Sequence, residues 1–176
     1  MKRKLLPLFL SLLLLLSACS VKGDANPDTA ETVGGGSIGT DSVHTCSLTV
    51  SCAVLLENGD LLDVDKAELV PEDGILLKLE NAEFEPGESV MDVLRREARN
   101  AKLHLETSDT PGMGSYVEGI GNLYEFDAGE LSGWLYRVNG EFQGMAASEY
   151  RLSDGDTVEY LYTCDMGADV GDTVMQ

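Results

Sequence analysis

The chain has 176 residues, with 12 Lys and Arg against 31 Asp and Glu and a formal net charge of −19. A surface this acidic repels phosphate backbones and anionic lipid headgroups, which argues against nucleic-acid binding and against a peripheral membrane-binding face. About 130 residues follow the N-terminal leader and linker, enough for one hydrophobic core and too few for two comfortable domains. We therefore expect a single domain.

The first 18 residues have the features of an export signal. Positions 2–4 are basic, positions 5–16 form a mostly apolar run of 12 residues, and Leu-Ser-Ala precedes Cys19. The run is shorter than the ~20 residues that span a bilayer, which disfavours a transmembrane anchor. Because the processing site resembles a bacterial lipobox, residues 1–18 are predicted to be a lipoprotein signal peptide. Acylation of Cys19 would anchor the protein to the outer face of the cell membrane, as in Gram-positive bacteria. An ordinary secretory signal cut near Ala18 is the alternative.

Residues 19–43 have the composition of a linker. They are poor in large apolar side chains and contain Pro27 and three consecutive glycines from Gly34. Such a segment cannot form a core, so we predict a flexible tether that begins at the lipidated Cys19. The predicted domain covers residues 44–172 and leaves 173–176 as a tail.

Two strands are predicted at the start of the domain. Alternate positions from Cys46 to Leu56 are apolar, and Ser or Thr lies between the first of them, which indicates a half-buried strand. A Pro-Glu-Asp-Gly turn signal at Pro71 precedes a second strand at 75–84.

One helix is predicted from local signals, from Ser89 to Lys102. Ser89 and Asp92 have the spacing of a capping box, and apolar residues recur at helical spacing behind them. The second half of the helix is basic. The macrodipole favours cations there, so we interpret this face as solvated charge, with a basic binding patch as the alternative; its residues are Arg95, Arg96, Arg99 and Lys102.

The middle of the chain is less regular. A strand is predicted at 103–107, followed by an irregular glycine-rich stretch at 109–122 and a short edge strand at 123–127. The two Gly-x-Gly groups of this stretch lack a following lysine and a strand-to-helix context, so they are interpreted as turns and not as a phosphate loop.

The clearest strand signals lie near the C-terminus. Residues 132–142 predict a β-hairpin, because aromatic and β-branched residues alternate and Asn139-Gly140 suits a type I′ turn. A final strand is predicted at 157–164, where Tyr160 and Tyr162 share a face and are expected to pack in the core.

Four short motifs occur in order along this part of the chain: Gly-Trp-Leu-Tyr-Arg-Val-Asn-Gly at 133–140, Ser-Glu-Tyr at 148–150, Asp-Gly-Asp at 154–156 and Tyr-Thr-Cys-Asp-Met-Gly at 162–167. Together they resemble the transcobalamin-like C-terminal domain, a module common in surface proteins of Gram-positive bacteria and mostly of unassigned function there. The resemblance extends upstream to about Cys46. It implies an α+β fold: a single β-grasp-like, ligand-binding domain with a mixed sheet and one main helix packed across it.

Three cysteines remain if Cys19 is lipidated. Cys46 and Cys52 are six steps apart on one strand, roughly 20 Å, and cannot bond to each other. The resemblance implies that the first and last strands are parallel neighbours. This would bring Cys52 near Cys164, so an exported protein is predicted to form the Cys52–Cys164 disulfide. A zinc site is disfavoured because three dispersed cysteines without a CxxC pair do not supply four ligands.

No catalytic motif is present in the globular part: there is no HExxH, CxxC, Gly-x-Ser-x-Gly or Ser-x-x-Lys sequence. We therefore expect a protein that is not an enzyme and has no metal centre. The acidic turns leave calcium as an alternative, although their spacing matches no EF-hand loop; they contain Asp154, Asp156, Asp165, Asp169 and Asp172.

Aromatic side chains are the remaining candidates for a ligand site, and they are Trp134, Tyr136, Tyr116, Tyr124 and Tyr150. The resemblance implies cobalamin or a similar small ligand, which transcobalamins and intrinsic factor hold between this kind of domain and a separate helical barrel. This chain has no room for such a barrel, so a partner would complete the site. A protein-interaction or adhesion module of the bacterial cell surface is the alternative.

Overall fold

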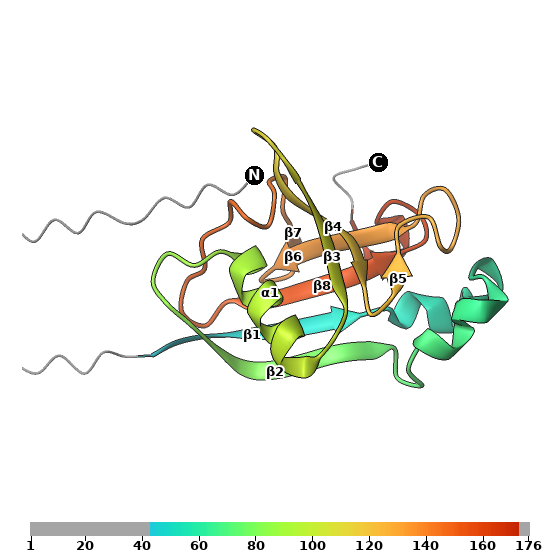
Figure 1. Ribbon diagram of the computed structural model, residues 1–176, viewed down its shortest axis with the longest axis horizontal. Coiled ribbons are helices and arrows are strands. Elements are labelled where there is room, and N and C mark those ends of the chain that lie inside the picture. The colour runs from blue at the N-terminus through green and yellow to red at the C-terminus, as the bar shows by residue number, and fades with distance from the viewer. Residues whose placement is uncertain (1–42, 173–176) are drawn as a thin grey trace, which may run out of the picture. The chain divides into compact units, whose positions relative to one another are not determined.

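A five-stranded mixed sheet forms most of the fold in the computed structural model, which describes residues 43–172 (Figure 1). The strand order is β2-β1-β8-β6-β7. These strands are β1 (His44–Ser51), β2 (Ile75–Phe84), β6 (Gly133–Val138), β7 (Glu141–Phe142) and β8 (Thr157–Thr163). β1 and β8 run parallel, with Thr49 opposite Glu159, and the other neighbours are antiparallel. The predicted fold class is confirmed, including the first and last strands as central parallel neighbours.

The predicted leader, the lipidation site Cys19 and the tail lie outside the described residues, as does the tether except for the exposed Val43. Within residues 43–172, no helix is long and apolar enough to cross a membrane.

Helix α1 (Val90–Ala101) lies in front of the sheet in Figure 1 and buries an apolar stripe against it. The predicted capping box is present: the Ser89 hydroxyl accepts from the Asp92 amide, and the Asp92 carboxylate accepts from the Ser89 amide. The buried residues are Val90, Met91, Val93, Leu94 and Ala98. Lys102 ends the helix in the left-handed conformation, with φ of 56°.

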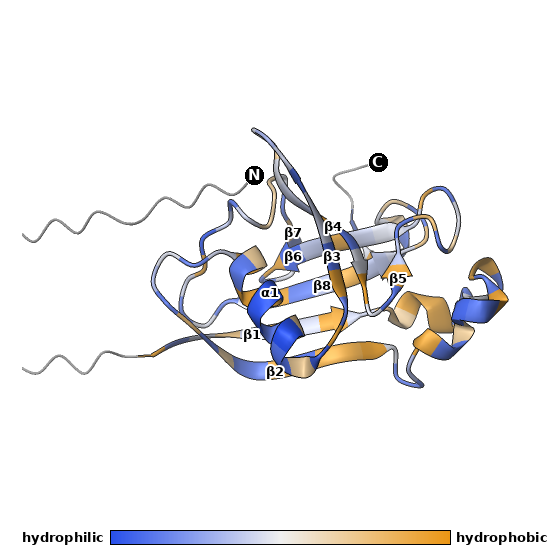
Figure 2. Cartoon of the chain, viewed as in Figure 1, coloured by the Kyte–Doolittle hydropathy of each residue, from blue (hydrophilic) through white to orange (hydrophobic). Residues whose placement is uncertain are grey.

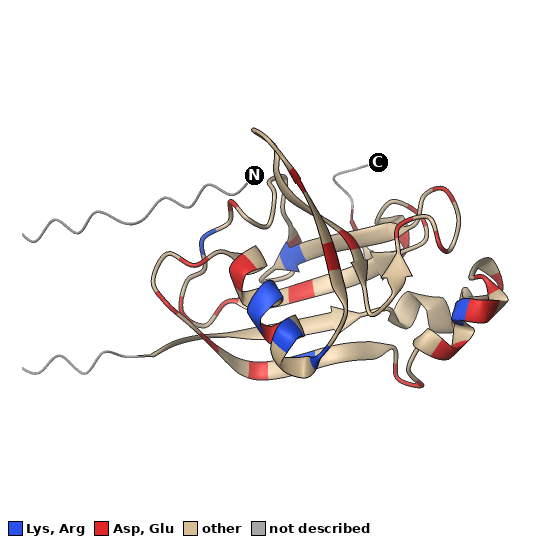
Figure 3. Ribbon diagram, viewed as in Figure 1, with Lys and Arg blue, Asp and Glu red and all other residues tan. Residues whose placement is uncertain are grey.

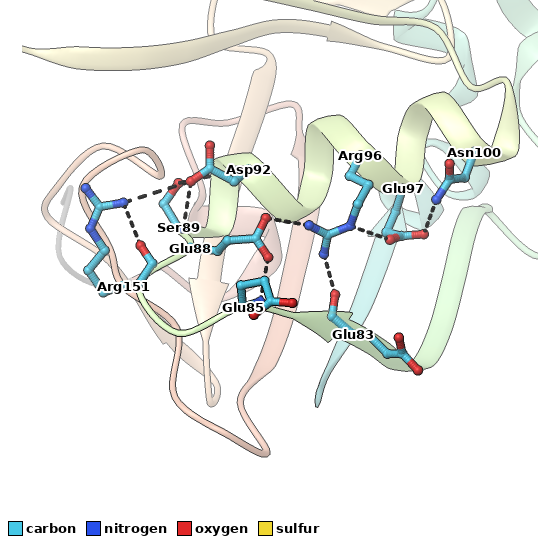
Figure 4. A network of polar contacts seen from close by, with 10 residues as sticks. Glu83, Glu85, Glu88, Ser89, Asp92, Arg96, Glu97, Asn100 and Arg151 are labelled. Atoms are coloured by element: carbon cyan, nitrogen blue, oxygen red, sulfur yellow. Dashed lines mark hydrogen bonds and ion pairs between the residues drawn. The ribbon is translucent and has the colours of Figure 1, made fainter. Parts of the chain in front are cut away.

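Two of the basic residues on α1 have structural partners. Arg96 donates to the carboxylates of Glu88 and Glu97 and to the carbonyl of Glu83, which ties the helix to the end of β2 (Figure 4). Arg95 donates to the next hairpin along the chain, at Thr107 Oγ1 (3.0 Å), Asp109 Oδ1 (3.2 Å) and Ser115 Oγ (3.3 Å). Arg95 and Arg96 therefore hold α1 in place, which favours a structural role for this basic face over a binding patch.

The stretch predicted to be irregular contains a strand. β3 (Leu105–Thr110) pairs with β4 (Gly114–Ile120), and β4 pairs with β5 (Leu123–Tyr124) to form a second, three-stranded sheet. The prediction for 109–122 was wrong because glycines hide the alternation of β4. Gly119 lies within β4, and a side chain is disfavoured there because a Cβ would approach the Tyr124 ring to 2.7 Å. Figure 1 shows the β3–β4 hairpin crossing the five-stranded sheet beside α1.

The first strand is shorter than predicted. It ends at Ser51, and the chain then forms three short 3₁₀ helices, η1 (Ala53–Leu56), η2 (Gly59–Leu61) and η3 (Val64–Leu69). The Ser51 hydroxyl accepts from the Ala53 amide, which favours the turn over a longer strand. Apolar and hydrophilic residues alternate irregularly along this projecting segment (Figure 2).

The predicted Cys52–Cys164 disulfide is absent from the structure, where Cys46, Cys52 and Cys164 are free. The register explains this result. Ser51 lies opposite Leu161, so Cys164 is two residues beyond the level of Cys52. Two strand steps of about 3.3 Å combined with a strand spacing of about 4.8 Å place the Cα atoms about 8 Å apart, beyond the usual range for a disulfide. Burial raises the pKa of the Cys52 thiol to about 11, which favours the protonated thiol at neutral pH.

Candidate functional site

A pocket of about 460 Å³ lies between the β3–β4 hairpin, strand β6 and the segment that follows β7. Its volume is within the range of sites that enclose drug-sized ligands. Aromatic and methionine side chains contribute much of the wall: Tyr116, Trp134, Tyr136, Phe142, Tyr160, Met113 and Met145. The wall combines elements that are far apart in the sequence, because β4 lies against β6.

Three of the five predicted ligand-site residues line this pocket, namely Trp134, Tyr136 and Tyr116. Their position on β6 and β4 brings them together. Tyr124 and Tyr150 are not part of its wall.

Trp134 is more deeply buried than the ligand-site prediction implied. Only 4% of the residue is exposed, and its indole nitrogen donates to the Leu123 carbonyl at 2.9 Å. Its ring meets Tyr162 edge to face, with 5.2 Å between the ring centroids. Trp134 is thus a core residue that also borders the pocket.

Tyr136 and Tyr116 each have a partner for the hydroxyl. Tyr136 donates to the Met145 carbonyl at 2.8 Å, and Tyr116 donates to a Glu125 carboxylate oxygen at 2.8 Å. Burial raises the pKa of both phenols to about 12, so they remain neutral donors at physiological pH.

Tyr160 differs from these residues. Its ring stacks on Tyr136, with centroids 5.8 Å apart and an angle of 29° between the planes, and only 2% of the residue is exposed. Its hydroxyl is the one buried side-chain polar atom within residues 43–172 that has no hydrogen-bond partner. Burial raises the pKa of this phenol, so it stays protonated and can act as a donor. The sequence predicted Tyr160 as core, and no sequence signal marked its hydroxyl.

The two predicted residues outside the pocket have structural contacts. Tyr124 has its hydroxyl 2.8 Å from His104 Nε2 and donates to Glu106 at 3.0 Å. Tyr150 packs against the core, and its carbonyl accepts from the Val90 amide at the start of α1.

The electrostatic character of the pocket is acidic. Glu118 and Asp172 belong to its wall, and no Lys, Arg or His is among the described residues that line it. The chain as a whole carries the same sign, and Figure 3 shows acidic residues spread over most elements. Anionic ligands are disfavoured by both the wall and the surrounding surface.

The described residues contain no group of three or more His, Cys, Asp or Glu that could hold a metal ion. The acidic turns considered for calcium accept from nearby donors instead. Asp154 accepts from the Thr45 amide (2.8 Å), Asp156 from the Asn139 amide side chain (2.9 Å) and Asp169 from the Cys164 amide (2.7 Å).

Comparisons with known proteins agree with the fold and leave the ligand open. A family described as a domain of unknown function, DUF4430, matches residues 87–163. The crystal structure of haptocorrin in complex with Cbi is similar at 14% identity with a TM-score of 0.50, covering 73% of this chain and 27% of that one. The chain therefore spans about a quarter of the length of haptocorrin. This likeness supports the resemblance to the transcobalamin-like C-terminal domain at the level of fold.

A second solved structure, a proposed metal-binding protein from Ruminococcus gnavus ATCC 29149, is 16% identical with a TM-score of 0.41, covering 68% of this chain and 96% of that one. No curated protein matches the sequence.

Proposed function

We propose that the protein is a non-enzymatic binding module, tethered by lipid to the outer face of the cell membrane, whose pocket receives a small ligand. The observation that carries this proposal is the pocket of about 460 Å³ walled by aromatic and methionine side chains. Pockets with an apolar wall and a few polar groups are the usual form of small-molecule sites.

A corrinoid such as cobalamin is our first candidate ligand, and a partner would have to share it. The fold resembles part of haptocorrin, whose structure contains Cbi. A pocket of this volume suits a drug-sized molecule, so it would accept one side or one substituent of a larger macrocycle. The remaining surface of the ligand would lie against the partner.

Tryptophan fluorescence tests direct corrinoid binding, because Trp134 is the only tryptophan and borders the pocket. Titration with cobalamin and related corrinoids, corrected for their absorption, should give saturable quenching, and calorimetry should give a matching affinity. Tyr136→Ala should weaken binding, whereas Tyr124→Phe, outside the pocket, should leave it unchanged. Absence of a saturable signal in both methods would exclude binding by this chain alone.

The tether is tested separately from the ligand. Cys19 follows the predicted processing site, so Cys19→Ser should release the protein into the medium, and Ser17→Thr serves as a control that keeps the cysteine. Retention of the Cys19→Ser protein in the membrane fraction would contradict lipid anchoring at this residue.

A second candidate function is a protein-interaction module. Apolar side chains are exposed on the 3₁₀ segment: Leu56 and Leu61 at 50% and Val64 at 86%. Exposed apolar residues within a polar rim are typical of protein contacts. Cell-surface crosslinking should then give an adduct that Val64→Asp reduces and Tyr136→Ala does not; the opposite pattern would favour the pocket.

A further inference from the structure

We infer that the pocket selects a compact aromatic molecule that carries no negative charge and has one hydrogen-bond acceptor, and that the Tyr160 hydroxyl is the group that pairs with the acceptor. This inference rests on the proposed function, since it specifies the ligand of the same pocket. It concerns what this chain binds by itself and does not require a corrinoid.

The shape and chemistry of the wall favour a flat apolar molecule. Tyr116, Tyr136 and Phe142 present aromatic surface from three different strands, and Met113 and Met145 lie beside them with 74% and 48% of each residue exposed. Aromatic rings favour stacked or edge-to-face contacts with another ring, and methionine adapts to irregular outlines.

The charges exclude an anion from this site. No described cationic side chain lines the pocket, Glu118 is part of its wall, and the chain carries a formal net charge of −19. A carboxylate or phosphate in the pocket would lose its hydration. Arg95, which donates to the wall residue Ser115, is already paired with Asp109 at 3.2 Å. The ligand is therefore not an anion where it enters.

The hydrogen bonds of the tyrosine hydroxyls in the wall indicate which of them could donate to a ligand. Tyr136 and Tyr116 already donate to Met145 and Glu125, whereas Tyr160 has no partner among the described residues. A buried hydroxyl without a partner is costly, and a ligand acceptor would remove that cost on binding. Because this hydroxyl is closed to water, a ligand reaches it only when a neighbouring side chain moves.

Three compounds that share the naphthalene ring system test this inference with the purified protein. 2-Naphthamide is neutral and carries an acceptor, 2-naphthoate is an anion, and naphthalene has no acceptor. Binding is measured by Trp134 fluorescence and by saturation-transfer NMR. We expect 2-naphthamide to bind at least about 10-fold more tightly than 2-naphthoate, because the carboxylate charge would be desolvated in an acidic pocket.

The variant Tyr160→Phe removes the hydroxyl alone and should weaken 2-naphthamide about 10-fold while leaving naphthalene unchanged. Thermal unfolding of the same variant checks that the fold is kept. Gly144→Leu offers a second approach: Gly144 belongs to the pocket wall, and a Cβ added to it would have no other atom within 4 Å, so added bulk should reduce binding of all probes. Gly59→Leu, in equally open space outside the pocket, is the matched control.

The outcomes separate this inference from the proposed function. Corrinoid binding without naphthamide binding would overturn the inference and leave the binding module intact. Naphthamide affinity that is unchanged in Tyr160→Phe, or 2-naphthoate binding as tightly as 2-naphthamide, would also overturn it. Failure of corrinoids and all three probes would overturn the inference and would also exclude small-ligand binding by this chain alone.

Discussion

Two tyrosines on β8 share one face of the sheet and are two positions apart, yet only one of their hydroxyls has a hydrogen-bond partner among the described residues. Tyr162 donates to the Tyr124 carbonyl at 2.7 Å and lies 3.1 Å from Ser132 Oγ. Tyr160 has no partner within residues 43–172 and belongs to the pocket wall. We call the surroundings of Tyr162 the sealed end of the strand and those of Tyr160 the pocket end.

The difference arises from what covers each end. At the sealed end, β5 and the turn before β6 bring backbone carbonyls and Ser132 over the strand, and Trp134 packs edge to face on Tyr162. At the pocket end, the cover is the β3–β4 hairpin and the segment after β7, which leave a cavity. The same residue type thus stabilises the fold at one end and is available for binding at the other.

The largest expected effect is on stability at the sealed end. Trp134→Ala should lower the free energy of unfolding by about 3–5 kcal/mol, because it removes a buried indole and leaves the Leu123 carbonyl unpaired. Urea unfolding followed by circular dichroism measures this loss. Tyr116→Ala, at a residue that is 46% exposed, is the control and should cost less than about 1.5 kcal/mol. Equal losses in the two variants would mean that Trp134 does not belong to the core.

The second prediction compares the two tyrosines directly. Tyr162→Phe should cost about 1–3 kcal/mol, since the Tyr124 carbonyl loses its donor. Tyr160→Phe should be neutral or slightly stabilising, because the hydroxyl that it removes has no partner in the described part of the chain. Each variant removes one buried phenolic hydroxyl from β8, so urea unfolding of both compares a hydroxyl that has a hydrogen-bond partner with one that has none among the described residues. A loss in Tyr160→Phe as large as in Tyr162→Phe would erase the distinction between the two ends.

Local signals allowed much of this fold to be predicted from the sequence. The Asn139-Gly140 turn has φ values of 54° and 82°, β2 has the predicted bounds, and the capping box at Ser89 is formed. Each of these features depends on residues within a few positions of one another. The parallel pairing of β1 with β8 came from the resemblance, since periodicity alone does not specify strand order.

The site could be predicted only in part. Alternation placed Trp134 and Tyr136 on one face of a hairpin, but the pocket also needs β4, whose glycines hid it from the sequence pattern. Whether a buried hydroxyl finds a partner depends on segments distant in the chain, so Tyr160 and Tyr162 look alike in sequence. The expected disulfide failed for a related reason, because an offset of two residues in register separates Cys52 from Cys164.

The third prediction tests whether the cap of α1 supports the pocket end. Amides at the start of the helix donate to the segment after β7: Val90 to the Tyr150 carbonyl and Met91 to the Ala147 carbonyl, which belongs to a residue of the pocket wall. Ser89→Ala should cost about 1 kcal/mol. Hydrogen exchange at Val90 and Met91 should accelerate by more than the roughly 5-fold that a loss of about 1 kcal/mol in global stability gives to a core amide such as Tyr162. Equal acceleration at Val90, Met91 and Tyr162 would show that the cap acts on the whole fold.

Ser89→Ala should also change how the free energy of unfolding depends on pH in the acid range. The Ser89 hydroxyl and amide lower the pKa of Asp92, so the capping box contributes stability above the pKa of about 4 that an unfolded Asp has, and this contribution is lost as the pH falls. Ser89→Ala removes one of these two hydrogen bonds. The difference in stability between wild type and Ser89→Ala should therefore shrink between about pH 5 and pH 2.

The smallest expected effect appears at alkaline pH and separates the two tyrosines once more. Burial raises the pKa of Tyr162 to about 12 and that of Tyr160 further still, with Tyr136 adding to the shift at Tyr160 and Arg95 opposing it. An unfolded tyrosine has a pKa of about 10, so above that pH the unfolded chain releases protons that the folded chain keeps, and the free energy of unfolding falls. Each Phe variant removes one such group, so both should lose less stability than wild type between about pH 10 and pH 11.

Denaturant unfolding at fixed pH values measures the slope of the free energy of unfolding against pH, and each protein at pH 7 is its own reference. The slope should decrease in Tyr160→Phe at least as much as in Tyr162→Phe, because Tyr160 is the more completely buried phenol. A Tyr160→Phe slope equal to that of wild type would show that this hydroxyl already reaches water, and the pocket end would then need no ligand to pair it.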